Sequence, residues 1–154
     1  MRKLIIPLIL LIALMTACGK PISSNDSSNS FDNVKDQMPK MSVVADGVIY
    51  QSATGAYCWS IKNATSCTDT SGDPFDYVDT APPIVVKPGE AIELRFTEDP
   101  DSFTIDLEVN DKSPNSIKGN PFVAPLVEGM YGYSVYTEWG SDDIAFHFVL
   151  DVQK

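Results

Sequence analysis

The chain has 154 residues, enough for one domain with a single core, and it carries 11 Lys and Arg against 21 Asp and Glu, a net charge of −10 at pH 7. An acidic surface of this kind repels the phosphates of nucleic acids and anionic lipid headgroups. No nucleic acid is therefore expected as a partner, and neutral or basic partners are favoured.

The first 17 residues, which precede Cys18, resemble the signal peptide of a bacterial lipoprotein. Arg2 and Lys3 come before an apolar run over 4–15, which is shorter than the ~20 residues of a membrane-spanning helix. Met15-Thr16-Ala17 then occupy the lipobox positions, although leucine is more usual than methionine at the first of them.

The resemblance implies that Cys18 receives a diacylglyceryl group, with acyl chains such as palmitate, and that residues 1–17 are removed. Two acyl chains anchor a protein stably, so the resemblance implies a lipid anchor at the extracytoplasmic face of the cell membrane. An ordinary secreted protein in which Cys18 has no role is the alternative. Loss of the signal would leave 9 basic and 21 acidic side chains, a net charge of about −12.

Assigning Cys18 to lipid leaves Cys58 and Cys67 as an even pair in an oxidising compartment, and we expect a disulfide between them. A two-residue loop at Lys62-Asn63, with Asn63 tolerating positive φ, would place the two cysteines opposite each other in a hairpin. A metal site is the alternative, but two cysteines without a nearby histidine lack the ligands that zinc requires.

Residues 18–40 are rich in Ser, Asn, Asp and Lys and are predicted to form a flexible tether, with a short helix over 31–38 as an option. Over 41–154, short extended runs alternate with turn residues, and no long run has helical spacing. The clearest strands are 91–97, 103–109, 131–139 and 144–152. Weaker ones are 42–44, 48–52, 56–61, 64–68, 84–86 and 122–126.

Two strand pairs are predicted from neighbouring runs. The runs 91–97 and 103–109 are expected to pair antiparallel across the polar turn 98–101, and 131–139 is expected to form a hairpin with 144–152. The proline-flanked segment 82–90 is predicted to be an edge strand followed by a tight turn. The number and spacing of the strands predict an all-β domain, an antiparallel two-sheet sandwich.

The run Gly129-Met130-Tyr131-Gly132-Tyr133-Ser134-Val135 resembles the penultimate strand of immunoglobulin-like domains. By that resemblance, Tyr131 is the corner tyrosine, whose hydroxyl binds the backbone, and Tyr133 replaces the core cysteine of the family. The resemblance therefore implies an immunoglobulin-like β-sandwich without the usual disulfide between its sheets.

A second resemblance rests on Tyr57-Cys58-Trp59 with Cys67, on Lys87-Pro88-Gly89-Glu90 and on the aromatic C-terminal hairpin. Together they are similar to a group of small lipoproteins of Gram-positive spore-forming bacteria, over about residues 48–152. The resemblance implies the fold and the location, and it carries over no catalytic or binding residues.

Four aromatic residues are candidates for a binding surface that stacks against sugar rings or a partner protein: Tyr57, Trp59, Tyr136 and Trp139. Core packing is the alternative for all of them. Tyr136 is the best candidate for exposure, because it points away from the face that Tyr133 and Val135 share.

His147 is the only histidine, and it is predicted to be exposed because it lies on the strand face opposite Phe146 and Phe148. The loop aspartates Asp69, Asp73, Asp76 and Asp79 are weak candidates for calcium ligands, since their spacing is not that of an EF-hand and turn formation also explains them. No metal or cofactor is expected.

The sequence contains no nucleophile elbow, phosphate-binding loop or histidine-based metal motif. We therefore expect no catalytic residues and a binding or interaction module at the cell envelope, with an envelope protein or a glycan as its partner. One alternative is an extracellular hydrolase or protease inhibitor with its site on loops. Another is a structural or stress-related envelope protein.

Overall fold

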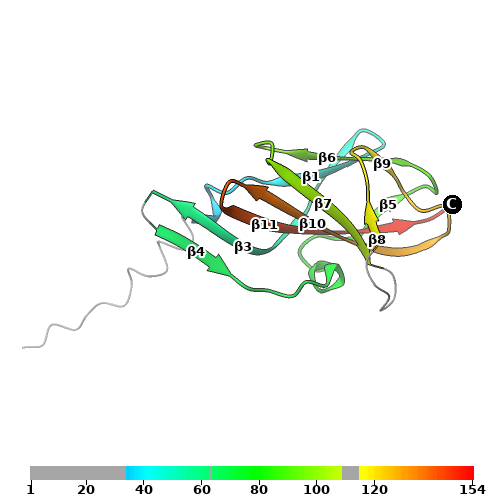
Figure 1. Ribbon diagram of the computed structural model, residues 1–154. Helices are drawn as coiled ribbons and strands as arrows, with labels where there is room; N and C mark the ends of the chain where they lie inside the picture. Colours follow the sequence, from blue (N-terminus) through cyan, green and yellow to red (C-terminus); the bar gives the residue numbers. More distant parts are fainter. Residues whose placement is uncertain (1–33, 63, 109–114) are drawn as a thin grey trace, which may run out of the picture.

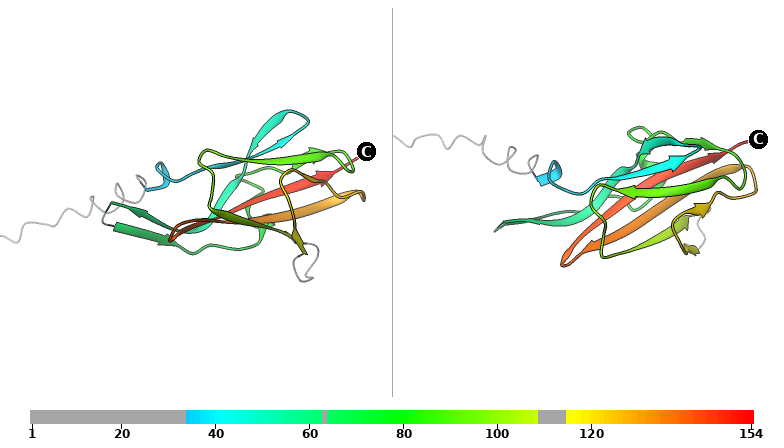
Figure 2. Two further views of the ribbon diagram at one scale, coloured as in Figure 1. Left: turned by 45° about the horizontal axis from the view of Figure 1, so that its top comes forward. Right: turned by 90° about the horizontal axis from the view of Figure 1, so that it is seen from above.

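Two packed β-sheets make up the chain in a computed structural model that describes residues 34–62, 64–108 and 115–154 (Figure 1). One sheet has four strands in the order β2-β1-β6-β9. The other has seven, in the order β4-β3-β11-β10-β7-β8, with β5 also paired to β11. The predicted all-β class and two-sheet sandwich are confirmed, and the two faces of the sandwich are seen in Figure 2.

The strands alternate with turns along the whole described chain. They are β1 (Met41–Ala45), β2 (Val48–Gln51), β3 (Ala53–Ile61), β4 (Ala64–Thr68), β5 (Ile84–Val86), β6 (Ala91–Phe96), β7 (Ser102–Glu108), β8 (Asn115–Ile117), β9 (Phe122–Val123), β10 (Gly129–Trp139) and β11 (Asp142–Val152), with one 3₁₀ helix, η1 (Pro74–Tyr77), after β4. Each strongly alternating run of the sequence is a strand, and β8 is a strand that the sequence did not predict.

The β10–β11 hairpin forms the centre of the core. Tyr133 and Val135 of β10 are fully buried, and the Tyr133 ring stacks on Phe148 of β11 with centroids 4.8 Å apart. Ile92 of β6 and Val43 of β1 are fully buried in the facing sheet. The shared faces predicted for Tyr133 with Val135 and for Phe146 with Phe148 are confirmed as buried, because period-two alternation fixes which side chains share a face.

The predicted pairing of the runs 91–97 and 103–109 is wrong. β6 pairs with β1 and β9 in the smaller sheet, whereas β7 pairs with β10 and β8 in the larger one. The segment 98–101 therefore crosses from one sheet to the other. Alternation shows that both strands have one buried face, but a sandwich offers that face a partner in either sheet.

β5 is the exception to the antiparallel pairing, because it runs parallel to the last residues of β11. β11 pairs with β10 along one edge and shares its other edge between β3 and β5. After β5 the chain turns at Lys87 to Glu90, where Glu90 N donates to Lys87 O at 3.1 Å and Gly89 has a φ of 74°. The predicted strand and tight turn over 82–90 are confirmed.

Tyr131 makes the backbone hydrogen bond that its resemblance to a corner tyrosine implies. Its hydroxyl donates to the carbonyl oxygen of Val127 at 2.9 Å, and Tyr133, two residues later, is fully buried. The strand order is compatible with an immunoglobulin-like arrangement.

Residues before β1 also pack against the sandwich. Met38 and Pro39 are buried, and the backbone of Lys40 exchanges hydrogen bonds with Thr97. Of the helix considered over 31–38, the described part holds only helical Val34 and Lys35. Cys18, the signal segment 1–17 and the first part of the tether lie outside the described residues. Within those that are described, no helix has the length and apolar character to cross a membrane.

One edge of β6 is completed by a side chain. β9 pairs only with Ala91 and Ile92, at the start of β6. Further along, Asn120 Oδ1 accepts from Leu94 N and Asn120 Nδ2 donates to Leu94 O, both at 2.8 Å. The Asn120 side chain thus takes the place of a neighbouring strand.

Candidate functional site

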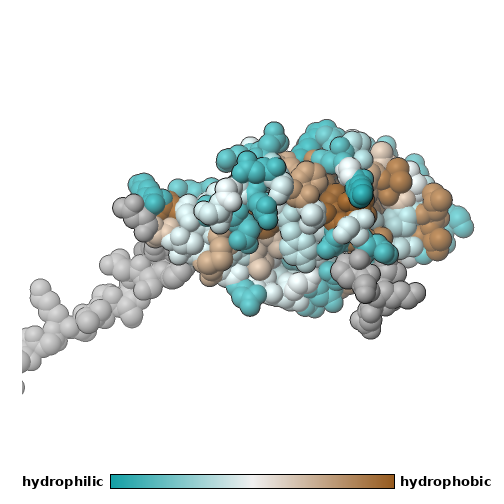
Figure 3. Space-filling model, viewed as in Figure 1, coloured by the Kyte–Doolittle hydropathy of each residue, from teal (hydrophilic) through white to brown (hydrophobic). Residues whose placement is uncertain are grey.

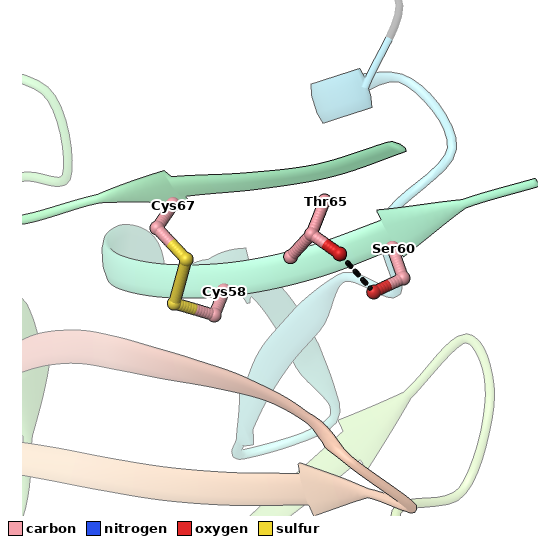
Figure 4. Close-up of a disulfide and its surroundings, with 4 residues drawn as sticks. All are labelled: Cys58, Ser60, Thr65 and Cys67. Carbon is pink, nitrogen blue, oxygen red and sulfur yellow. Dashed lines mark hydrogen bonds between the residues drawn. A yellow bond between two sulfur atoms is a disulfide. The ribbon is translucent and has the colours of Figure 1, made fainter. Parts of the chain in front are cut away.

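The disulfide hairpin of β3 and β4 extends beyond the rest of the sandwich (Figure 2). Cys58 pairs with Cys67 in the predicted register, with their Cα atoms 4.1 Å apart, and they form a disulfide. Ser60 and Thr65 share a hydrogen bond of 2.9 Å further along (Figure 4). Lys62 has a φ of 54°, while Asn63 lies outside the described residues. The predicted disulfide and register are confirmed.

Replacing Cys58 and Cys67 together by serine should lower the free energy of unfolding by about 2–3 kcal/mol, because the crosslink restricts the unfolded chain. Urea denaturation followed by circular dichroism measures the change. Thr65→Ala, which removes only an exposed hydroxyl bond, serves as the control and should cost below about 0.5 kcal/mol. A double variant as stable as the wild type would contradict the expectation.

The four candidate aromatic residues do not share one surface. Tyr57 lies in the core at 4% exposure. Trp59 and Trp139 pack edge to face with centroids 5.6 Å apart, and Trp139 Nε1 donates to Asp99 O at 3.1 Å. Tyr136 is 45% exposed, as predicted, and points from the outer face of the larger sheet.

The surroundings of Tyr136 are hydroxyls and carboxylates. Its neighbours across the strands are Thr104 and Ala145, and the next row places Glu138 directly opposite Asp143. Ser102 Oγ donates to Glu138 at 2.8 Å. Like charges opposite each other are unfavourable, and a ligand that donates hydrogen bonds or carries positive charge would relieve the repulsion between Glu138 and Asp143. The exposed Tyr136 ring beside these carboxylates is therefore suited to a hydroxyl-rich or basic ligand.

A second part of the outer face is covered by residues 69–81, here called the cover segment (the green coil after β4 in Figure 1). Within it, Asp73 caps η1 by accepting from Phe75 N at 2.9 Å, and Asp76 accepts a hydrogen bond from the Ser71 hydroxyl. In the described ranges, no group of three or more His, Cys, Asp or Glu side chains is placed to hold a metal. These two carboxylates thus close the segment's own turns.

His147 lies beneath the cover segment, so the prediction that it is exposed is wrong. It is 1% exposed, and the Tyr77 ring stacks on it with centroids 4.8 Å apart and planes within 10°. Alternation placed His147 correctly on the outer face of β11. Because the cover segment packs on that face, β11 is buried on both sides, and the apolar run 144–150, interrupted only by His147, is the sequence signal that fits such a strand.

A polar cluster surrounds His147. Ser134 Oγ lies 3.1 Å from His147 Nδ1 and donates to Glu108 Oε1 at 3.0 Å, while His147 Nε2 has no hydrogen-bond partner among the described residues. Burial lowers the pKa of His147 to about 4, against a smaller opposing effect of Asp73.

The cluster differs from a catalytic triad, in which a carboxylate orients the histidine and the serine is open to substrate. Here the carboxylate of Glu108 binds the serine, and Ser134 is fully buried. In this arrangement the three side chains bind one another, and the cluster has a structural role.

Exposed apolar side chains gather at the end of the sandwich that carries the C-terminus, and we call this the apolar end (Figure 3). Seven of the eight large hydrophobic residues that are exposed in the described part lie near the turns of this end, at 45–78% exposure: Val48, Ile49, Val85, Val123, Leu126, Val127 and Met130. The chain enters the sandwich at the opposite end (Figure 1).

A groove of about 280 Å³ opens on the same end, between β2 of one sheet and β5 of the other. Val48, Tyr50 and Val85 give it an apolar lining, and its charged lining residues are balanced: Asp46, Lys87, Glu90 and Lys154. Clustered exposed apolar surface is uncommon on a monomer and marks interaction sites. The sequence contains the signal for it in the run 121–127, which is mostly apolar although only Phe122 and Val123 of the strand predicted over 122–126 lie in a strand.

No family model, no curated protein and no solved structure matches this chain.

Proposed function

We propose that this protein is a non-enzymatic binding module, anchored by lipid at Cys18 to the extracytoplasmic face of the cell membrane, and that its apolar end binds an envelope protein. The observation that carries the proposal is the concentration of exposed aliphatic side chains, such as Leu126 at 78%, at one end. Scattered exposed aliphatics are ordinary, whereas a gathered set with a groove is typical of an interface.

The position of the apolar end supports this function. The described chain enters at the end formed by the β3–β4 hairpin and the β10–β11 turn, and the apolar end lies at the far end (Figure 1). A chain tethered through residues before Val34 would therefore present the apolar end away from its anchor. The partner expected there has an extended apolar segment that fits the Val48, Tyr50 and Val85 side chains of the groove.

A glycan is a second candidate partner, favoured by the exposed Tyr136 ring and the neighbouring Glu138 and Asp143. Aromatic rings stack on the apolar faces of sugars, and carboxylates accept hydrogen bonds from sugar hydroxyls. This ligand would bind the outer face of the larger sheet and leave the apolar end free.

Site-specific photo-crosslinking in cells distinguishes the two partners. A benzophenone side chain in place of Leu126 should give a discrete protein adduct, which the same group at Ser141, on the opposite end, should not give. The adduct should disappear in a Cys18→Ala chain, which lacks the anchor. Glycan adducts at position 136 alone would favour the second candidate, and equal adducts at positions 126 and 141 would contradict binding at the apolar end.

A further inference from the structure

The cover segment contacts the outer face at the Ser134 hydroxyl, which has Gly72 O at 3.4 Å as a second acceptor besides Glu108, and at two packing points. Pro74 is buried over Gly132, where an added Cβ would lie 3.0 Å from the Phe75 ring and 3.1 Å from Pro74. The second point is the stack of Tyr77 on His147. The Tyr77 hydroxyl donates within the segment, to Ser71 O at 2.7 Å, so no hydrogen bond of that hydroxyl ties the segment to the sheet.

We propose that the cover segment is an acid-released lid, which lifts from β10 and β11 when His147 is protonated while the two sheets stay folded. The proposal does not depend on the identity of a partner. Opening would uncover Ser134, His147 and Gly132, beside the exposed Tyr136.

The hydrogen bonds around His147 explain why a proton disfavours the closed form. In a neutral ring that carries its proton on Nδ1, this N–H donates to Ser134 Oγ, and the Ser134 hydroxyl donates to Glu108. A second proton must then go to Nε2, which faces Gly55 and has no acceptor among the described residues. A buried charged donor without an acceptor is costly, and water reaches this edge once Tyr77 has moved.

The charged groups near His147 do not remove this cost. From the cover segment, the Asp73 carboxylate acts on the ring and favours its charged form, but burial has the larger effect on the pKa. From β7, Glu108 reaches Ser134 rather than the imidazole. The neighbouring residues of β3, β10 and β11, which are Ala53 to Ala56, Gly132, Ser134, Ala145 and Val149, carry no titratable side chain.

The pH range over which the lid opens follows from the pKa of His147 in the closed and open forms. The pKa is about 4 in the closed form and near 6.5 where the ring is solvated, so the closed form is fully favoured above about pH 6.5 and loses this advantage as the pH falls towards 4. Between these values the ratio of open to closed form rises about tenfold for each pH unit, to roughly 300-fold in all.

The single histidine makes the test direct, because its NMR signal needs no assignment. On the full chain in detergent, hydrogen exchange of residues 69–81, corrected for the intrinsic rate, should quicken about tenfold per pH unit below about pH 6.5, while β10 and β11 stay protected. An unchanged corrected rate, or exchange of β10 and β11 together with the segment, would overturn the proposal. So would an imidazole that titrates near pH 6.5.

His147→Asn is the matched variant, since its amide donates to Ser134 but does not titrate in this range. The segment should then exchange at a rate independent of pH between about pH 6.5 and about pH 4.5. If wild type and variant open alike, protonation of carboxylates such as Asp73 causes the opening and the proposal fails. Should the variant not fold, the wild type alone provides the test. The pH midpoint of His147 titration and the pH midpoint of segment opening should then agree, and a difference between them would overturn the proposal.

Discussion

Replacing Tyr133 by alanine is expected to lower the free energy of unfolding by about 3–5 kcal/mol, the range for removing a large buried aromatic side chain. Tyr133 is fully buried, its ring stacks on Phe148 at 4.8 Å, and it lies 5.5 Å from the Phe122 ring. The side chain therefore joins the centre of the larger sheet to β9, the edge strand of the smaller sheet. Chemical denaturation measures the loss as a shift in midpoint at constant slope.

The hydroxyl of Tyr133 gives this prediction a close control. Its oxygen is buried and has no hydrogen-bond partner among the described residues, and burial raises its pKa above the usual value. Tyr133→Phe keeps the ring and removes the unpaired group, so it is expected to be neutral or to stabilise by up to about 1–2 kcal/mol. A loss of more than about 1 kcal/mol in this variant would show that the hydroxyl has a partner in solution.

Gly55→Ala should destabilise the protein by on the order of 3 kcal/mol, an unusually large effect for adding one methyl group. The new Cβ would overlap His147 Nε2 and lie 2.6 Å from Cδ2 of the same ring, with Ala145 O at 3.3 Å. His147 is held on its other side by Tyr77, so the ring has little room to move. Thermal or urea unfolding of the variant measures the cost.

A double-mutant cycle separates this overlap from other effects of the substitution. His147→Ala empties the space beside position 55, so Gly55→Ala should cost much less in that background than in the wild type. Gly72→Ala is the control, because an added Cβ there meets no atom within 4 Å, and it should change stability by less than about 0.5 kcal/mol. Equal costs of Gly55→Ala in both backgrounds would contradict the overlap.

The parts of the fold that the sequence predicts are those with local causes. The β10–β11 hairpin follows from alternation on both sides of Gly140, and the disulfide follows from the position of Lys62-Asn63 relative to Cys58 and Cys67. Each depends on the geometry of a turn and on the alternation of side chains along a strand. Residues that are close in the sequence determine both. The partner of β6, by contrast, depends on which sheet the chain enters after residue 97.

The same division applies to the candidate site. Tyr136 and Trp139 are three residues apart on one strand, so alternation places them on opposite faces, and the single surface expected for the four aromatic residues is wrong. The apolar run 144–150 around His147 fits a strand buried on both faces, but nothing in it indicates the covering segment, which lies about 70 residues earlier in the chain. Strand alternation gives the direction of a side chain, and only tertiary packing decides what covers it.

The Asn120 side chain has a consequence for contacts between copies of the chain. Exposed strand edges with free N–H and C=O groups recruit strands from other chains. By occupying both backbone groups of Leu94, Asn120 leaves that stretch of β6 nothing to offer an incoming strand. Together with β9, a single amide thus closes this part of the edge of the smaller sheet to pairing with another chain.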